Sequence, residues 1–165
     1  MENKRFLECC CIDAAEAVEA MTGGAGRVEL CEDLPCGGVT PSRADIEAAL
    51  KAVNISVNVL IRVRGGDFVY DEDEIEAMIG SVRMCRELGV NGVVVGALRA
   101  DGSVDTEAVG RLMAEAQGLR ITFHRAFDEF ARKQAQKHRE ILAHVEAELN
   151  LPKSLRRNAT KAMEE

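Results

Sequence analysis

Short strand-like segments alternate with helix-like segments over the first 124 residues. The strand-like segments cover residues 5–11, 27–31, 55–63, 91–98 and 119–124. Amphipathic segments between them predict helices over residues 14–23, 46–53, 71–88 and 106–116. Residues suited to N-capping precede these helices, namely Asp13, Ser42, Asp71 and Asp105. Strands that recur at roughly 30-residue intervals with a helix between them form βαβ units and a parallel sheet. The fold class is therefore α/β, either an open doubly wound sheet or a (β/α)8 barrel.

The distribution of polar side chains on the strands distinguishes these two architectures. On the second strand, Arg27, Glu29 and Cys31 share one face, while Val28 and Leu30 share the other. The same division recurs on three other strands, whose polar faces carry Glu8 with Cys10, Asn58 with Arg62, and Thr122 with His124. An open sheet between two helical layers is apolar on both faces. A barrel can instead point polar side chains inward at the carboxyl ends of its strands. We therefore predict a TIM-barrel-like arrangement.

The number of strands is too small for a closed barrel. A complete (β/α)8 barrel takes about 250 residues, and the sequence after residue 124 contains no convincing strand. Instead it predicts one helix from about Asp128 to Leu149, followed by a break at Pro152 and a short basic segment. We expect an incomplete barrel of about five parallel strands over residues 1–128, and a helical tail over residues 129–165 that packs on it or extends from it.

The charge balance limits the classes of partner. The chain has 28 acidic and 21 basic residues and a formal net charge of -7. This argues against nucleic acid or an anionic membrane surface as the main partner, because either favours a basic face. No apolar run approaches the ~20 residues of a membrane helix, and the first residues lack a signal-peptide pattern. We expect a cytoplasmic protein whose six cysteines stay reduced.

Several segments closely resemble, in order, the signatures of the CutC copper-homeostasis family. These segments are GGAGRVELC, GGVTPS, IRVRGGDFVY, MCRELGVNGVVVGAL, DGSVDTEAVGRLM and ITFHRAFDE. The resemblance covers about residues 5–129, and the tail does not match. Three positions depart from the family pattern: Gly26 and Ser81 stand where Asp is usual, and Val63 stands where Pro is usual. The resemblance implies a cytoplasmic TIM-barrel protein implicated in copper handling, with no reaction assigned.

Cysteines on neighbouring strands are the candidate metal ligands. Cys10 and Cys31 lie on the polar faces of the first two strands. Both coincide with cysteines that the resemblance links to copper binding, and two thiolates suit Cu(I) better than a hard ion. Cys36 in the following loop is a weaker candidate for a further ligand. The alternative is that these cysteines are small buried hydrophobic residues.

A second group of candidates consists of charged residues near the carboxyl ends of strands. They all fall in segments that resemble the family: Glu8, Arg27, Glu29, Arg62, Arg64, His124, Arg125 and Asp128. Glu8 or Glu29 is the candidate general base, His124 the candidate acid or base, and Arg62 with Arg64 the candidate anion clamp. The other three, Arg27, Arg125 and Asp128, are candidate substrate-binding residues. The alternative is a set of Glu–Arg ion pairs that fill the barrel interior.

Three hypotheses about function follow. The first is a cytoplasmic copper-homeostasis protein that binds Cu(I) through strand-end cysteines. The second is a TIM-barrel enzyme of unassigned reaction that uses the Glu, Arg and His cluster on a small anionic substrate. The third is a truncated relative without activity. The expected partners are a copper ion, a small anionic ligand and further copies of the chain, with no nucleic acid and no membrane.

Overall fold

The computed structural model describes the backbone of residues 6–148 and the side chains of residues 6–144. The chain divides into two compact units, Met1–Phe127 and Asp128–Glu165.

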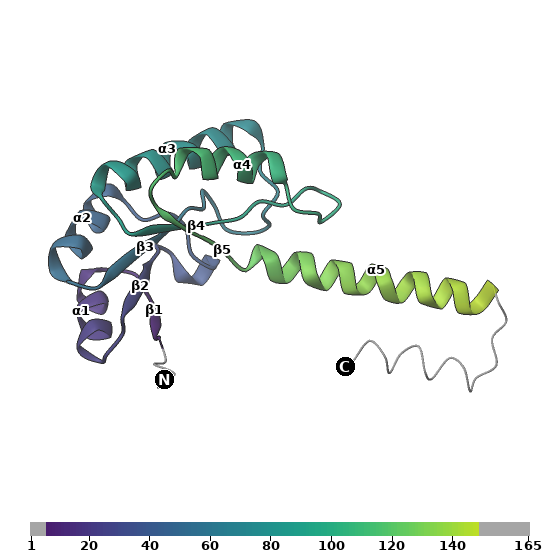
Figure 1. The fold of residues 1–165 in the computed structure, drawn as a ribbon, viewed down its shortest axis with the longest axis horizontal. Helices are drawn as coiled ribbons and strands as arrows, with labels where there is room; N and C mark the ends of the chain where they lie inside the picture. The colour runs from purple at the N-terminus through teal and green to yellow at the C-terminus, as the bar shows by residue number, and fades with distance from the viewer. Residues whose placement is uncertain (1–5, 149–165) are drawn as a thin grey trace. The chain divides into compact units, whose positions relative to one another are not determined.

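The first unit is built from alternating strands and helices, as predicted (Figure 1). The strands are β1 (Glu8–Cys11), β2 (Arg27–Leu30), β3 (Ser56–Leu60), β4 (Gly92–Val95) and β5 (Arg120–Phe123). The helices are α1 (Ala14–Thr22), α2 (Arg43–Ala52), α3 (Glu72–Leu88) and α4 (Thr106–Glu115), with a 3-10 turn η1 (Leu34–Cys36) after β2. All five predicted strands and all four predicted helices of this unit are confirmed, and every strand is shorter than predicted.

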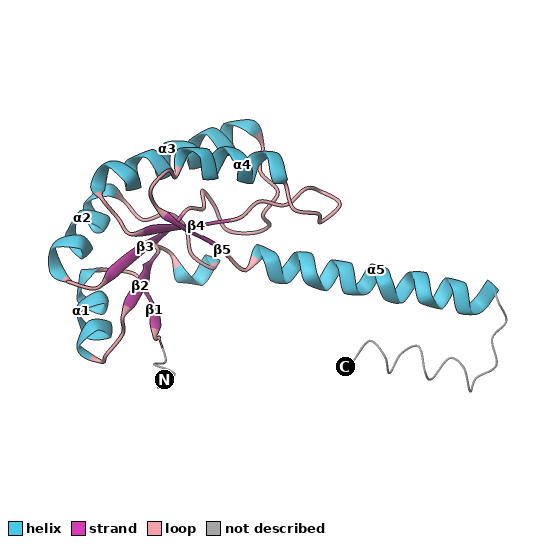
Figure 2. Cartoon of the chain, in the orientation of Figure 1, coloured by secondary structure: helices cyan, strands magenta, loops and turns pink. Residues whose placement is uncertain are grey.

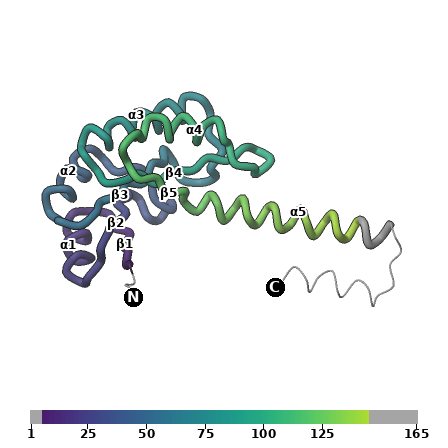
Figure 3. The backbone as a smooth tube through the Cα atoms, viewed as in Figure 1, coloured from purple at the N-terminus to yellow at the C-terminus, as the bar shows by residue number. Residues whose placement is uncertain are grey.

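The five strands form one parallel sheet in the order β1-β2-β3-β4-β5. Helices α1 to α4 lie along one side of this sheet (Figure 2). The backbone trace in Figure 3 shows the same single helical layer. A doubly wound sheet carries helices on both faces, so this arrangement confirms the TIM-barrel-like prediction. The sheet does not close, and within the described residues β1 and β5 are its two edges.

The hydrophobic core lies between the sheet and the helical layer. Val28 and Val59 point from the sheet toward the helices and are fully buried. They pack in one cluster with Ile46 of α2, Met78 of α3 and Leu112 of α4, each 0% exposed. Burial of such side chains stabilises the fold by about 1.5–3 kcal/mol each. The face of the sheet toward the helices is therefore occupied by core packing. Only the opposite face is free to carry functional side chains.

All four predicted capping residues cap their helices. The side chains of Asp13, Ser42 and Asp105 each accept a hydrogen bond from the first turn of α1, α2 and α4 respectively. Asp71 and Glu74 form a reciprocal capping box at the start of α3. These caps satisfy backbone N–H groups that lack a partner within the helix. The caps fix the residue at which each helix begins. That residue is also where the loop from the preceding strand ends.

Replacement of Asp71 by Ala is expected to lower the free energy of unfolding by about 1 kcal/mol. Asp71 Oδ1 accepts from the Glu74 N–H at 2.9 Å, and the Asp71 N–H donates to Glu74 Oε2 at 3.0 Å. Urea denaturation measures the change. The matched control is Asp73→Ala, because Asp73 lies in the same acidic first turn and makes no capping bond. Equal losses in the two variants would contradict a specific capping role.

Helix α5 (Ala126–Glu148) begins at the end of the first unit and continues into the second. The predicted tail helix is confirmed, and it starts two residues before Asp128. Leu149, Pro152 and the basic segment lie outside the described residues. The packing of the tail on the barrel stays a prediction. Within residues 6–148, no helix combines the length and the apolar character that crossing a membrane requires.

Candidate functional site

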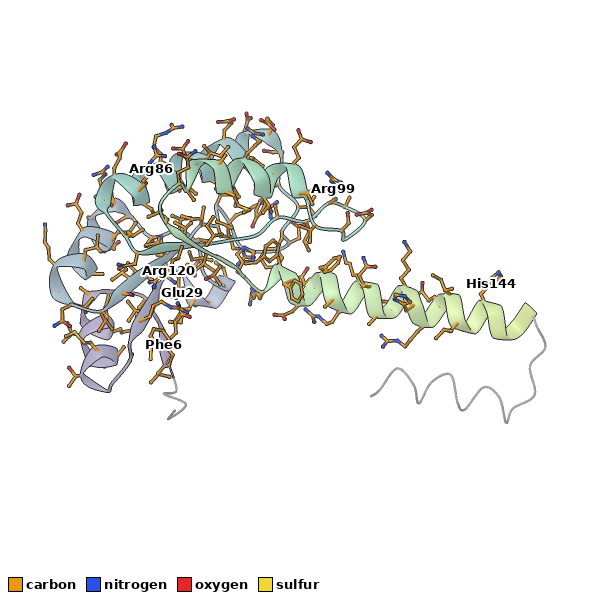
Figure 4. All side chains as sticks on the ribbon, in the orientation of Figure 1. Phe6, Glu29, Arg86, Arg99, Arg120 and His144 are labelled. Carbon is orange, nitrogen blue, oxygen red and sulfur yellow. The ribbon has the colours of Figure 1, made fainter. Side chains whose placement is uncertain are left out.

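Polar side chains gather on the face of the sheet that the helices leave uncovered. Figure 4 shows Glu29, Arg120 and Phe6 on this side, whereas Arg86 lies on the helical layer. The parallel register places Cys10 opposite Glu29, and Glu29 opposite Asn58. Side chains at opposed positions of a sheet point to the same face. The register therefore brings together residues that are far apart in the sequence.

The two candidate metal-binding cysteines lie next to each other. Cys10 Sγ of β1 is 3.4 Å from Sγ of Cys31, which follows β2. Cys31 is only 1% exposed, whereas Cys10 is exposed. Burial, followed by the hydrogen bond with Cys10, raises the pKa of Cys31 to about 12. The pair therefore combines an accessible thiol with a buried thiol that keeps its proton at neutral pH.

The remaining cysteines do not join this pair. Cys9 and Cys11 lie on the opposite face of β1 and pack into the core, as does Cys85 of α3. The Cys36 thiol donates to the backbone oxygen of Asp33 at 3.1 Å. Within the described part of the chain, no group of three or more His, Cys, Asp or Glu residues is placed to hold a metal ion. The site offers two thiols, which matches a metal ion that accepts low coordination numbers.

Glu8 and Arg27 form an ion pair at the start of the uncovered face. Arg27 Nε and Nη2 donate to the two carboxylate oxygens of Glu8 at 2.7 and 2.6 Å. The fully buried Asn58 also donates to Glu8 at 3.4 Å. This bidentate geometry orients both side chains. In this structure Glu8 and Arg27 thus form an ion pair with each other, which was the alternative to a role in catalysis or substrate binding.

Among the described residues, Glu29 on this face forms no ion pair with a basic side chain. Its pKa is raised by burial and by the charge of Glu8, and Arg27 opposes the shift. No described residue donates a hydrogen bond to its side chain. A carboxyl group with a raised pKa can exchange a proton nearer to neutral pH. A general-base role for Glu29 agrees with this environment and stays a prediction.

Arg62 and Arg64 hold different partners. Arg62 is 1% exposed, and its Nη1 donates to the backbone oxygens of residues 36–38 while its Nη2 donates to that of Gly66. Arg64 pairs instead with Glu74 at 2.5 Å and with Asp67 at 3.1 Å. Arg62 therefore ties together the loops that follow β2 and β3. The predicted clamp of these two arginines on one anion stays a prediction.

His124 follows β5 and lies among aromatic and basic side chains. Its ring centroid is 4.8 Å from that of Phe68, and its Nδ1 accepts from the N–H of Ala126 at 3.1 Å. Burial, followed by the charge of Arg62 and then Arg125, lowers the pKa of His124 to about 4. His124 is thus neutral at physiological pH.

The other two candidates near the end of β5 differ in position. Arg125 is exposed and lies over the Phe68 ring, with its Cζ 5.9 Å from the ring centroid. Asp128 belongs to the second unit, where its backbone oxygen accepts from Arg132. Our sequence reasoning missed Phe68 as a central contact. The sequence did hold a signal for it: Phe68 is an aromatic residue two positions after the pair Gly65–Gly66 in the loop that follows β3.

The comparisons with known proteins agree on one family. The model of the CutC family matches residues 5–165, so the match runs beyond Glu129, where we expected the resemblance to end. A CutC family protein of Porphyromonas gingivalis is 51% identical over 122 residues, which are 74% of this chain and 49% of the relative. The human copper homeostasis protein cutC homolog is 48% identical over 124 residues, 74% of this chain and 45% of the relative.

A solved structure supports the fold. The crystal structure of a copper homeostasis protein CutC from Streptococcus agalactiae matches with a TM-score of 0.72 and 36% identity. The match covers 76% of this chain and 61% of that one. The chain spans about half the length of the curated relatives that it matches.

Proposed function

Because the chain belongs to the CutC family, we propose that it serves copper homeostasis by binding Cu(I) between Cys10 and Cys31. The observation that carries the proposal is the 3.4 Å separation of the two Sγ atoms. Soft thiolates select Cu(I) over the hard cations. The binding site requires reduced thiols, which the cytoplasm maintains.

The environments of the two thiols suit capture of a metal ion from solution. Cys10 is exposed and meets the incoming ion first, and Cys31 completes the site from a buried position. Both thiols must lose their protons to bind as thiolates. Because the pKa of Cys31 is raised to about 12, copper has to displace its proton. We expect the apparent affinity to rise with pH, by up to about tenfold per pH unit for each proton released.

Anaerobic titration of the reduced protein against a chromophoric Cu(I) chelator tests the proposal. We expect Cys10→Ser and Cys31→Ser each to lower the affinity by about a hundredfold, which is ~2.7 kcal/mol. The matched control is Cys9→Ser, because Cys9 neighbours Cys10 on β1 but packs against the core. Unchanged affinity and stoichiometry in the double variant Cys10→Ser/Cys31→Ser would refute the proposal. Circular dichroism confirms that each variant is folded.

The enzymatic alternative has no comparable observation. Glu8 and Arg27 are paired with each other, and Arg62 is bonded to loop carbonyls. Catalytic roles for Glu29 and His124 stay predictions without a named reaction.

A further inference from the structure

Three nitrogen-bearing side chains surround the ring of Phe68 in the loop after β3. The Arg62 Cζ is 4.7 Å and the Arg125 Cζ 5.9 Å from the Phe68 ring centroid. The His124 ring centroid lies 4.8 Å from the same point. We call these four residues the Phe68 cluster. It contains neither Cys10 nor Cys31, so it is distinct from the proposed copper site.

His124 presents a hydrogen-bond donor that has no acceptor. Its Nδ1 accepts from the N–H of Ala126, so in the neutral ring the proton resides on Nε2. The Nε2 atom is buried, and no described residue forms a hydrogen bond with it. Buried donors in folded proteins nearly always have an acceptor. Within the described residues, the Nε2 donor of His124 is therefore unsatisfied, and a hydrogen-bond acceptor at this position would satisfy it.

The two arginines of the cluster carry positive charge. The carboxylate of Asp67, whose pKa is lowered by its hydrogen bond with Arg64 and also by the charge of Arg62, forms its ion pair with Arg64 instead. Within residues 6–144, neither Arg62 nor Arg125 forms an ion pair, and Arg62 bonds only to neutral backbone oxygens. Buried charges normally have partners of opposite sign. In contrast, Arg27 and Arg64 are both paired with carboxylates. The Phe68 cluster is thus locally electropositive in a chain whose net charge is -7.

Two glycines make room for this arrangement. A Cβ at Gly37 would collide with Arg125 Nη2 and lie 3.2 Å from Arg62 Nη1. The two guanidinium groups therefore approach one point, although like charges repel. A Cβ at Gly96 would lie 2.7 Å from Nδ1 of His124. The missing side chain of Gly37, in the loop after β2, thus leaves room for Arg62 and Arg125. The missing side chain of Gly96, directly after β4, leaves room for the His124 ring.

We propose that the Phe68 cluster binds an oxyanion, the phosphate or carboxylate group of a small molecule. The oxyanion accepts from Nε2 of His124 and from the guanidinium of Arg125, and its charge offsets that of the buried Arg62. Guanidinium groups match the geometry of both phosphate and carboxylate oxygens. The exposed Arg125 is the group that first meets the ligand.

NMR of the protein with 15N-labelled histidine tests the proposal with inorganic phosphate, acetate and chloride as probes. The sequence has three histidines, and His138 and His144 of α5 serve as internal controls. We expect phosphate or acetate to shift the Nε2 signal of His124 and to slow exchange of its proton, while chloride does not. Preference for phosphate or for acetate identifies which source of oxyanion the site accepts. No change at His124 with either oxyanion would overturn the proposal.

Calorimetric titration of the effective oxyanion assigns the binding to Arg125. We expect Arg125→Gln to weaken binding by about tenfold, as for loss of a hydrogen bond between charged groups. The matched control Arg120→Gln removes the same charge at the other end of β5 and should change the affinity by less than about twofold. Equal weakening in both variants would show general charge attraction and overturn the proposal. The double variant Cys10→Ser/Cys31→Ser should bind the oxyanion unchanged, which separates this site from the copper proposal.

Discussion

Replacement of Arg62 by Met is expected to lower the free energy of unfolding by about 3–4 kcal/mol. The Arg62 side chain is 1% exposed and donates to four backbone oxygens, those of residues 36–38 and of Gly66. Each of these oxygens loses a partner worth about 1 kcal/mol when the guanidinium is removed. Met fills much of the same volume, so the loss reports mainly on the hydrogen bonds. Urea denaturation at neutral pH measures it.

Two further variants separate the hydrogen bonds of Arg62 from its charge. Arg62→Lys keeps the charge but cannot reach both loops at once, so we expect it to recover only part of the loss. Arg64→Met is the matched control, because Arg64 is 40% exposed and forms surface ion pairs with Glu74 and Asp67. Exposed pairs contribute about 1 kcal/mol or less. Similar losses for Arg62→Met and Arg64→Met would contradict a special role of Arg62 in joining the loops.

The fold was predictable because its local signals agree with one another. Residues 55–63 are mostly apolar and rich in β-branched side chains, and Asp71 with Glu74 marks the start of α3. The predicted third strand was too long for a reason that the sequence does not show. Beyond Leu60, the N–H of Arg62 donates to the Thr40 hydroxyl at 2.7 Å and not to a backbone oxygen of a neighbouring strand. A side-chain contact with a residue 22 positions away in the sequence thus takes the place of strand pairing at Arg62.

The candidate site was predictable where it depends on strand parity. Cys10 and Cys31 share a face of adjacent strands, and the structure places their sulfurs in contact. Residues in loops were harder to place, because their partners are set by tertiary structure. Arg64 lies only two residues beyond Arg62 in the loop after β3, yet its side chain binds Glu74 of α3. The alternation of side chains along a strand predicts which face of the sheet a strand residue points to. It predicts nothing about where a side chain in a loop points.

Acidification is expected to destabilise the protein through His124, by about 3 kcal/mol between pH 7 and pH 4. The pKa of His124 falls from 6.5 to about 4 in the folded state, mainly because of burial and then because of the charges of Arg62 and Arg125. Below pH 6.5 the unfolded chain binds a proton that the folded chain does not bind. The stabilisation by neutral His124 is therefore complete above pH 6.5 and is lost as the pH falls toward 4.

Comparison with His124→Gln isolates this contribution, because Gln does not titrate. Asp67 and Glu74 have lowered pKa values and Glu29 a raised one, but these groups are common to both proteins and cancel in the difference. Urea denaturation at pH 7.5, 6.5, 5.5 and 4.5 in buffers without phosphate or carboxylate keeps the Phe68 cluster free of oxyanions. His138→Gln on α5 is the control, and its pH profile should follow that of the parent protein. A stability difference between parent and His124→Gln that stays constant from pH 7.5 to 4.5 would show that His124 charges freely in the fold. That result would contradict the electropositive environment around His124, which is one of the grounds for the oxyanion proposal.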